Sequence, residues 1–135
     1  QRQMCIRDRA AQAVGCEPAR IAKTLSFAVD GGCVLIVCAG DAKIDNTKFK
    51  AQFHAKATML TPEQVLDFTG HAVGGVCPFG IDNPAVTTYL DVSLRRFDTV
   101  YPAAGNAASA VRLSCGELDI LSNSSGWIDV CKNWS

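Results

Sequence analysis

Two apolar runs that flank a short turn constrain this chain more than any other feature of its sequence. The first run, residues 21–29, alternates larger side chains with small or hydroxyl-bearing ones, as in a strand with two different faces. The second run, residues 33–39, is apolar without interruption, which is typical of a strand covered on both faces. Between them Asp30-Gly31-Gly32 predicts a tight hairpin, and we assign its positive φ angles to the two glycines.

A lysine stands among the larger residues of the first run. Lys23 shares its register with Ile21, Leu25 and Phe27, so it is expected on the face that packs inward. An ammonium group without a partner is costly to bury, so such a lysine either reaches solvent at the strand end or serves a site. Since lysine stems often extend along apolar surface to water, spacing alone favours the first alternative.

Length and charge bound the classes of protein that this chain can be. With 135 residues it can form one compact core but not two ordinary domains. Its formal net charge is zero, so it has no broad basic field suited to a long nucleic-acid duplex. No apolar run approaches the roughly 20 residues that span a bilayer, and no secretory signal is recognisable. We therefore expect no membrane association.

The first nine residues do not read as part of a fold. Residues 1–9, QRQMCIRDR, resemble the translated read-through of a sequencing adaptor and have no usable periodicity. We expect them to be a non-native tail, followed by a single domain over residues 10–135.

Short strands interleaved with short helices predict an α+β domain. Asp45 or Asn46 is expected to cap a helix that runs to Phe53. Thr61 is expected to cap the next helix, with Pro62 in its first position and three apolar side chains facing inward: Val65, Leu66 and Phe68. Further strands are predicted at residues 86–90, 99–103, 110–113 and 127–131, with a helical turn ending at residue 96 and a helix after Ser114.

The cysteines and histidines do not predict a metal centre or a disulfide framework. The seven cysteines are scattered without a CxxC pair, and there are only two histidines. Cys33 and Cys38 should point to opposite faces of their strand. The pattern favours reduced thiols that act as small core residues, in a cytoplasmic protein without a metal or another cofactor.

Two further features could carry chemistry besides Lys23. The loop Gly74-Gly75-Val76-Cys77-Pro78 could direct backbone N–H groups at an oxyanion or carbonyl, although such glycine-rich turns are more often structural. Cys77 and His71 could also act as a thiol nucleophile and its base. No sequence feature orients that histidine, so a buried thiol and a hydrogen-bonded loop histidine are favoured.

A modest basic cluster follows the hairpin. Partly offset by nearby aspartates, it is typical of a solvated helix face, and a functional alternative is contact with a few phosphates of a nucleic-acid end. Its members are Lys43, Lys48, Lys50, His54 and Lys56.

Five blocks of sequence together resemble the YbaK/EbsC family, the freestanding relatives of the editing domain inserted in bacterial prolyl-tRNA synthetases. The blocks are GCEPARIAKTLSF, TGHAVGGVCPFG, YLDVSLRRF, VYPAAG and WIDVCK, in the family's order and spacing over about residues 10–132. The resemblance implies a mixed, partly open β-barrel flanked by short helices. It also implies hydrolysis of mischarged aminoacyl-tRNA without a metal or another cofactor, on tRNA-Pro carrying a small wrong amino acid such as cysteine or alanine.

The same resemblance implies the residues of the site. Lys23 and the loop formed by Gly74, Gly75, Val76, Cys77 and Pro78 fall on the family's catalytic lysine and GxxxP loop. Substrate-binding roles are implied for Thr24, Phe27, His71, Pro78 and Gly105. The implied partners are the acceptor end of an aminoacyl-tRNA and, as a further candidate, prolyl-tRNA synthetase.

Two departures from the family pattern bear on activity and specificity. The family has a further strand and helix before residue 10, with residues that help to wall the pocket. We expect this chain to lack them, because the adaptor-like tail stands in their place. Members that remove cysteine carry an acidic residue where this chain has Ala110, which leaves alanine, serine or another small amino acid open. The alternatives are a non-catalytic module that binds a tRNA acceptor end or a synthetase, and, more distantly, a hydrolase that uses Cys77.

Overall fold

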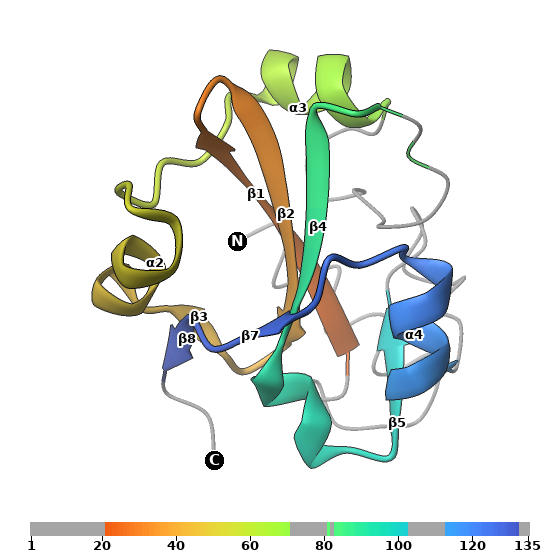
Figure 1. Ribbon diagram of the computed structural model, residues 1–135. Coiled ribbons are helices and arrows are strands. Elements are labelled where there is room, and N and C mark those ends of the chain that lie inside the picture. The colour runs from red at the N-terminus through yellow and green to blue at the C-terminus, as the bar shows by residue number, and fades with distance from the viewer. Residues whose placement is uncertain (1–20, 71–80, 82, 103–112, 133–135) are drawn as a thin grey trace.

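A mixed six-stranded sheet forms the centre of the molecule in this computed structural model, which describes residues 21–70, 81, 83–102 and 113–132 (Figure 1). The strand order is β6-β5-β1-β2-β4-β7. Neighbouring pairs are antiparallel in β1–β2 and β5–β6 and parallel in β1–β5, β2–β4 and β4–β7. The strands are β1 (Ile21–Val29), β2 (Gly32–Ala39), β4 (Val86–Asp91), β5 (Thr99–Pro102), β6 (Leu113–Ser114) and β7 (Trp127–Ile128).

Short helices and a second, two-stranded sheet complete the architecture. The second sheet pairs β3 (Lys43–Ile44) with β8 (Cys131–Lys132) in antiparallel orientation. Two of the helices, α2 and α4, lie on opposite sides of the central strands in Figure 1. The mixed sheet curls into a half-barrel, which confirms the predicted α+β fold. The helical segments are α2 (Asn46–Phe53), α3 (Pro62–Thr69), the 3₁₀ helix η2 (Val92–Arg96) and α4 (Cys115–Leu121).

The predicted hairpin is present, but its turn is one residue earlier than expected. Asp30 and Gly31 have φ angles of 51° and 77°, and Val29 pairs with Gly32. This two-residue loop has the positive φ angles of a type I′ turn, for which Asp-Gly is a preferred sequence. The assignment of the positive angles to Gly31 and Gly32 was therefore wrong, because Gly32 already belongs to β2.

Gly32 is required for a different reason, which is close approach of two backbones. A Cβ atom on Gly32 would lie 2.8 Å from the carbonyl oxygen of Ala85, which also accepts a hydrogen bond from the Cys33 N–H group at 2.9 Å. We expect Gly32→Ala to lower the free energy of unfolding by about 1–3 kcal/mol, because neither backbone can move without breaking this contact. Denaturant unfolding of the variant measures the loss.

Gly116→Ala is the matched control for Gly32→Ala. Gly116 lies in α4, where a new Cβ atom would meet only the Ser114 hydroxyl at 3.9 Å. Alanine at a helical position should leave stability unchanged or raise it by about 0.5–1 kcal/mol. Equal behaviour of the two variants would contradict the close-approach explanation.

The uninterrupted apolar run forms a strand covered on both faces, as predicted. Every residue from 33 to 39 is buried, with at most 7% of its surface exposed. Val34, Ile36 and Cys38 belong to the larger core cluster, whereas Cys33 and Leu35 pack in a smaller one. Cys33 and Cys38 therefore lie in different clusters, as their spacing predicted.

Local sequence signals set the helix boundaries. The Asp45 carboxylate accepts hydrogen bonds from the first turn of α2, and His54 ends that helix with a φ angle of 58°. Thr61 and Ser114 each form a capping box at the start of α3 and α4. These three helix starts confirm the predictions made from sequence.

Two predictions, one for a residue of α3 and one for the last strand, were wrong. Leu66, predicted to face inward from α3, is 54% exposed, because Val65 and Thr69 occupy the buried side of this helix.

The predicted single strand over residues 127–131 is divided into two short strands. Residues 127–128 pair with β4 and residues 131–132 pair with β3, so the chain leaves one sheet for the other.

None of the helices in the part of the chain that the structure describes is both long enough and apolar enough to cross a membrane.

Candidate functional site

Lys23 lies in β1 with its side chain half-buried and its ammonium group held by the main chain. Its Nζ atom donates a hydrogen bond of 2.5 Å to the carbonyl oxygen of Ala42, which is fully buried. On β1 it stands opposite Cys38 of β2, on the side of the sheet where Phe27 packs into the core. The inward register predicted for Lys23 is therefore observed. Lys23 is partly exposed, and the described acceptor of its ammonium group is a buried carbonyl.

Two other predicted site residues lie on the same strand. Thr24 is half-buried and pairs with Val37, so it points to the opposite side of β1 from Lys23. Phe27 is 3% exposed, and its ring centroid lies 5.0 Å from that of Phe49 in α2. Phe27 thus anchors α2 against the sheet. The substrate-binding roles of Thr24 and Phe27 remain predictions.

The other predicted site residues lie outside the described part of the chain. They are His71, the loop residues Gly74, Gly75, Val76, Cys77 and Pro78, and Gly105. Their roles, and the alternative Cys77–His71 pair, remain predictions.

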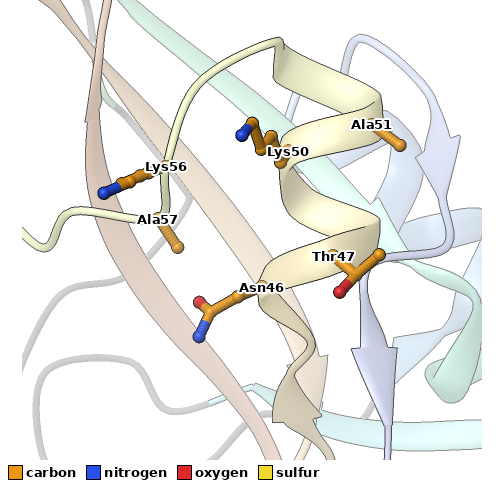
Figure 2. A pocket seen from close by; sticks show the side chains of 6 residues that line it. All are labelled: Asn46, Thr47, Lys50, Ala51, Lys56 and Ala57. Carbon is orange, nitrogen blue, oxygen red and sulfur yellow. The ribbon is translucent and has the colours of Figure 1, made fainter.

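A hollow of about 620 Å³ lies beside α2 (Figure 2). Both segments that line the hollow are linked to β1, the strand that carries Lys23. One is α2, which follows β3 and Ala42, the residue whose carbonyl binds Lys23. The other is the segment after Ala57, where the Thr58 carbonyl accepts a hydrogen bond from the Ala28 N–H group and the Leu60 N–H group donates to the Ser26 carbonyl. Its lining residues are Asn46, Thr47, Lys50, Ala51, Lys56 and Ala57.

The hollow has a cationic rim with two separate positive charges. In Figure 2, Lys50 points from α2 toward the segment that carries Ala57, while Lys56 extends from that segment away from the helix. Both side chains are exposed. Lysine ammonium groups are among the groups through which proteins contact nucleic-acid phosphates.

Lys48 of the predicted basic cluster is already engaged. Its Nζ atom lies 3.0 Å from the Asp129 carboxylate and 3.0 Å from the Cys131 carbonyl oxygen. The hydrogen bond to Asp129 raises the pKa of Lys48 above its ordinary value. This lysine ties α2 to the C-terminal strand, and the cationic character of the hollow comes from Lys50 and Lys56.

The four cysteines in the described residues are free thiols, and three of them are poorly suited to nucleophilic attack. Burial raises the pKa of Cys33 to about 11 and also raises the pKa of Cys115. A hydrogen bond with Cys38 and burial raise the pKa of Cys131. Since the thiolate is the reactive form, the raised pKa values of Cys33, Cys115 and Cys131 disfavour nucleophilic attack by these three thiols.

The described residues include no group of three or more His, Cys, Asp or Glu side chains that could hold a metal ion.

Sequence reasoning missed the groups that hold Lys23 in place. The acceptor is a main-chain carbonyl of Ala42, and Arg96 forms an ion pair with Asp41 next to it. A main-chain acceptor leaves no trace in residue identity, and Arg96 and Asp41 are 55 residues apart. The block YLDVSLRRF, which contains Arg96, contributed to the resemblance to the family but did not indicate a partner for this arginine.

Comparison with known proteins identifies the class to which this fold and its lysine-bearing strand belong. Residues 6–120 match the family described as the aminoacyl-tRNA editing domain, and the chain belongs to that family. This match includes the strand that carries Lys23 and the hollow beside α2.

Among its relatives, the uncharacterized protein YwhH of Bacillus subtilis (strain 168) is 54% identical over 129 residues, which cover 94% of this chain and 81% of that protein. The proline–tRNA ligase of Solidesulfovibrio magneticus is 37% identical over 94 residues, and that of Thermotoga sp. (strain RQ2) is 31% identical over 85. These matches cover 68% and 62% of this chain but only 16% and 15% of the ligases. The chain is thus related to one part of proline–tRNA ligases.

Solved structures share the fold over most of the chain. One, proposed to be a trans-editing enzyme for prolyl-tRNA synthetase, has a TM-score of 0.82 at 33% identity and covers 91% of this chain and 77% of that one. Another, from work on grafting epitopes onto scaffold proteins, has a TM-score of 0.85 at 30% identity, with coverage of 93% and 80%. The recognition of this family from its sequence blocks is confirmed.

Proposed function

We propose that this chain is a trans-editing hydrolase, an aminoacyl-tRNA deacylase that cleaves the ester of mischarged tRNA in the cytoplasm. Lys23 is the observation that carries the proposal. Its ammonium group lies on the core side of β1, and its described acceptor, the Ala42 carbonyl, is neutral and holds it without cancelling its charge. Membership of the editing-domain family supports the same chemistry.

The reaction requires stabilisation of a developing oxyanion. Water adds to the ester carbonyl carbon, the carbonyl oxygen gains negative charge, and the bond from that carbon to the ribose oxygen then breaks. The attacking water gives up a proton, the ribose oxygen takes one up, and the products are free amino acid and tRNA. A preorganised donor at the oxyanion contributes about 3–4 kcal/mol where such donors have been removed from other enzymes.

We assign the donors to two parts of the chain. Lys23 holds the ester or the terminal ribose and phosphate through charge-assisted hydrogen bonds. The backbone N–H groups of the Gly74-Gly75-Val76-Cys77-Pro78 loop supply the oxyanion site. No side-chain nucleophile is required in this proposal, and the attacking species is water or a group of the substrate itself.

The proposed substrate is tRNA-Pro carrying a small wrong amino acid, with cysteine and alanine as the first candidates. A synthetase pocket separates amino acids that differ by one methylene by only about 1–3 kcal/mol, so errors of this kind require a second, hydrolytic step. The relation to proline–tRNA ligases supports tRNA-Pro, and makes prolyl-tRNA synthetase a candidate partner. We propose that catalysis needs neither a metal nor another cofactor.

Deacylation of a panel of mischarged tRNAs tests this proposal. Preferred release of one small amino acid from tRNA-Pro is the expected result. The alternative is a non-catalytic module on the same fold, which would bind the acceptor end or the synthetase and hydrolyse no ester. Tight binding without turnover of any member of the panel would favour that alternative.

We place the phosphates of the acceptor end on the rim of the hollow beside α2. Replacing both Lys50 and Lys56 with alanine should raise the Kd for tRNA about tenfold, because two phosphate contacts are lost. The slope of log K against log salt should fall by about 0.7 for each contact to a single strand. Fluorescence anisotropy over a salt series measures both quantities.

Lys132→Ala is the matched control, since it removes an exposed lysine of β8 that does not line the hollow. It should leave the Kd and the salt slope near those of the parent protein. An unchanged Kd in the Lys50 and Lys56 double variant would remove the rim from the proposed tRNA surface.

A further inference from the structure

The turn that follows β2 fixes the carbonyl that accepts the Lys23 hydrogen bond. Ala42 is fully buried, and its N–H group donates to the Ala39 carbonyl at 3.0 Å, which closes the turn. Its own carbonyl faces the Lys23 ammonium at 2.5 Å. We call residues 39–42 the acceptor turn. The direction of the Ala42 carbonyl, and with it the position of Nζ, depends on how firmly this turn is held.

Arg96 binds the exposed residue of the acceptor turn, Asp41, through both terminal nitrogens of its guanidinium group. In Arg96, Nη2 donates to one carboxylate oxygen of Asp41 at 2.5 Å and Nη1 donates to the other at 3.1 Å. The Arg96 side chain is 16% exposed and that of Asp41 is 38% exposed. A two-point pair of this kind fixes both distance and orientation, which a lysine in place of the arginine could not do.

The same short helix also holds the start of the turn. The hydroxyl oxygen of Ser93 accepts a hydrogen bond from the Ala39 N–H group at 3.2 Å, and the Arg96 Nε atom donates to the Ser93 carbonyl at 2.9 Å. Ser93 and Arg96 both belong to η2. Hydrogen bonds with η2 therefore fix the acceptor turn at Ala39 and at Asp41, on the two sides of Gly40.

We propose that Arg96 and Asp41 are positioning residues for Lys23, acting through the Ala42 carbonyl. This inference rests on the proposed function, because it assigns to Lys23 the reacting role. Two N–H groups of Arg96 donate to the Asp41 carboxylate and its Nε atom donates to Ser93, so this side chain joins the acceptor turn to η2 and fixes the direction of the Ala42 carbonyl. A displacement of about 1 Å at a reacting group can cost about a hundredfold in rate.

The first experiment observes the Lys23 ammonium group itself. In ¹⁵N-labelled protein, a hydrogen bond slows the exchange of lysine ammonium protons with water, which makes the Nζ resonance observable. The signal of Lys23 is identified by its absence in Lys23→Ala. We expect Arg96→Ala and Asp41→Asn to shift or broaden this signal. Lys48→Ala is the matched control, since it removes another lysine–aspartate pair and a bond to a carbonyl, and should leave the Lys23 signal in place.

The second experiment measures single-turnover deacylation at saturating protein, beside the Kd for uncharged tRNA and the melting temperature. Arg96→Ala and Asp41→Asn should each lower the rate constant about tenfold at an unchanged Kd. The rate constant of Arg96→Lys should lie between those of the parent protein and Arg96→Ala, because lysine keeps the positive charge but cannot form the two-point pair with Asp41. Asp41→Asn replaces a surface side chain with one of equal size, so it tests the inference even where Arg96→Ala lowers stability.

An unchanged Lys23 resonance, or an unchanged rate constant, in both Arg96→Ala and Asp41→Asn would overturn the inference. Failure of the proposed function has a different signature, which is parent-level deacylation by Lys23→Ala. The resonance experiment does not depend on activity, so the two failures can be told apart.

Discussion

Replacing Lys23 with alanine should lower the single-turnover rate of deacylation by about a hundredfold to a thousandfold, because the ester or the terminal ribose and phosphate loses a charge-assisted contact; removal of one donor to a reacting group in other enzymes has an effect of this size. The ammonium group is held at 2.5 Å from a neutral carbonyl, so its charge is directed but not cancelled by that contact. Alanine removes the charge from the site and leaves the strand pairing of β1 with β2 intact.

The same variant should remain folded, with a free energy of unfolding lower by about 1–3 kcal/mol at most. Its main cost is the buried Ala42 carbonyl, which loses its hydrogen-bond donor, and an unpaired group of this kind costs about 1–3 kcal/mol when water cannot reach it. Lys23→Met keeps most of the apolar side chain of lysine. It should show the same loss of rate as Lys23→Ala while preserving more of the packing around β1.

Rates and melting temperatures measured together decide the assignment. Lys132→Ala removes an exposed lysine of β8; it is the control variant and should deacylate at the parent rate. Near-parent turnover by Lys23→Ala and Lys23→Met would remove this lysine from the chemistry and would favour the non-catalytic module.

The sequence predicted those parts of the fold that depend on near neighbours. The capping boxes at Thr61 and Ser114 require only residues three positions apart, and both occur as predicted. The uninterrupted run in β2 predicted burial on both faces because no other strand environment accepts seven apolar residues in succession. Even the hairpin error was local, since Asp30 took a positive φ angle that we assigned to Gly32.

Contacts between distant parts of the chain could not be predicted in this way. The parallel pairings of β2 with β4 and of β4 with β7 join strands that are far apart in sequence. The strand predicted over residues 127–131 shows an apolar alternation that is correct in period, but periodicity does not reveal that its two ends pair in different sheets. Partner choice depends on packing across the whole domain.

The site shows the same division between local and distant information. Lys23 could be found because a cation in an apolar register violates a local rule, and such violations concentrate at functional sites. Its acceptor on Ala42 and the Arg96–Asp41 pair could not be found, because a carbonyl has no sequence signature and the pair spans 55 residues. The resemblance to the editing-domain family supplied the lysine's role but not what holds it.

Replacing Asp91 with alanine should produce the largest loss of stability of any single change considered for this chain, about 3 kcal/mol or more. Asp91 is fully buried, and its two carboxylate oxygens accept hydrogen bonds of 2.9 Å from the Ser93 and Val130 N–H groups. Alanine would leave both N–H groups buried without an acceptor and would open a cavity. Each unpaired donor costs about 1–3 kcal/mol, and the cavity adds to that sum.

Asp45→Ala is the matched control for Asp91→Ala. Asp45 also caps a helix through two main-chain N–H groups, those of Thr47 and Lys48, but its side chain is only partly buried. Water can replace a cap at such a position, so the expected cost is about 1 kcal/mol. For a domain of this size a loss of about 3 kcal/mol lowers the melting temperature by about 10 °C, and calorimetry separates the two variants.

The position of Asp91 also links its stability effect to the site. Its carboxylate caps η2, the helix whose Ser93 and Arg96 grip the acceptor turn, and its second oxygen holds the C-terminal segment at Val130. Asp91→Asn keeps the size of the side chain but offers one acceptor oxygen where two donors converge, so it should lose stability as well. At a temperature where Asp91→Asn remains folded, its deacylation rate should fall with the loosening of η2. A loss below about 1 kcal/mol for Asp91→Ala would mean that the two N–H groups find other acceptors, and that this carboxylate does not anchor η2.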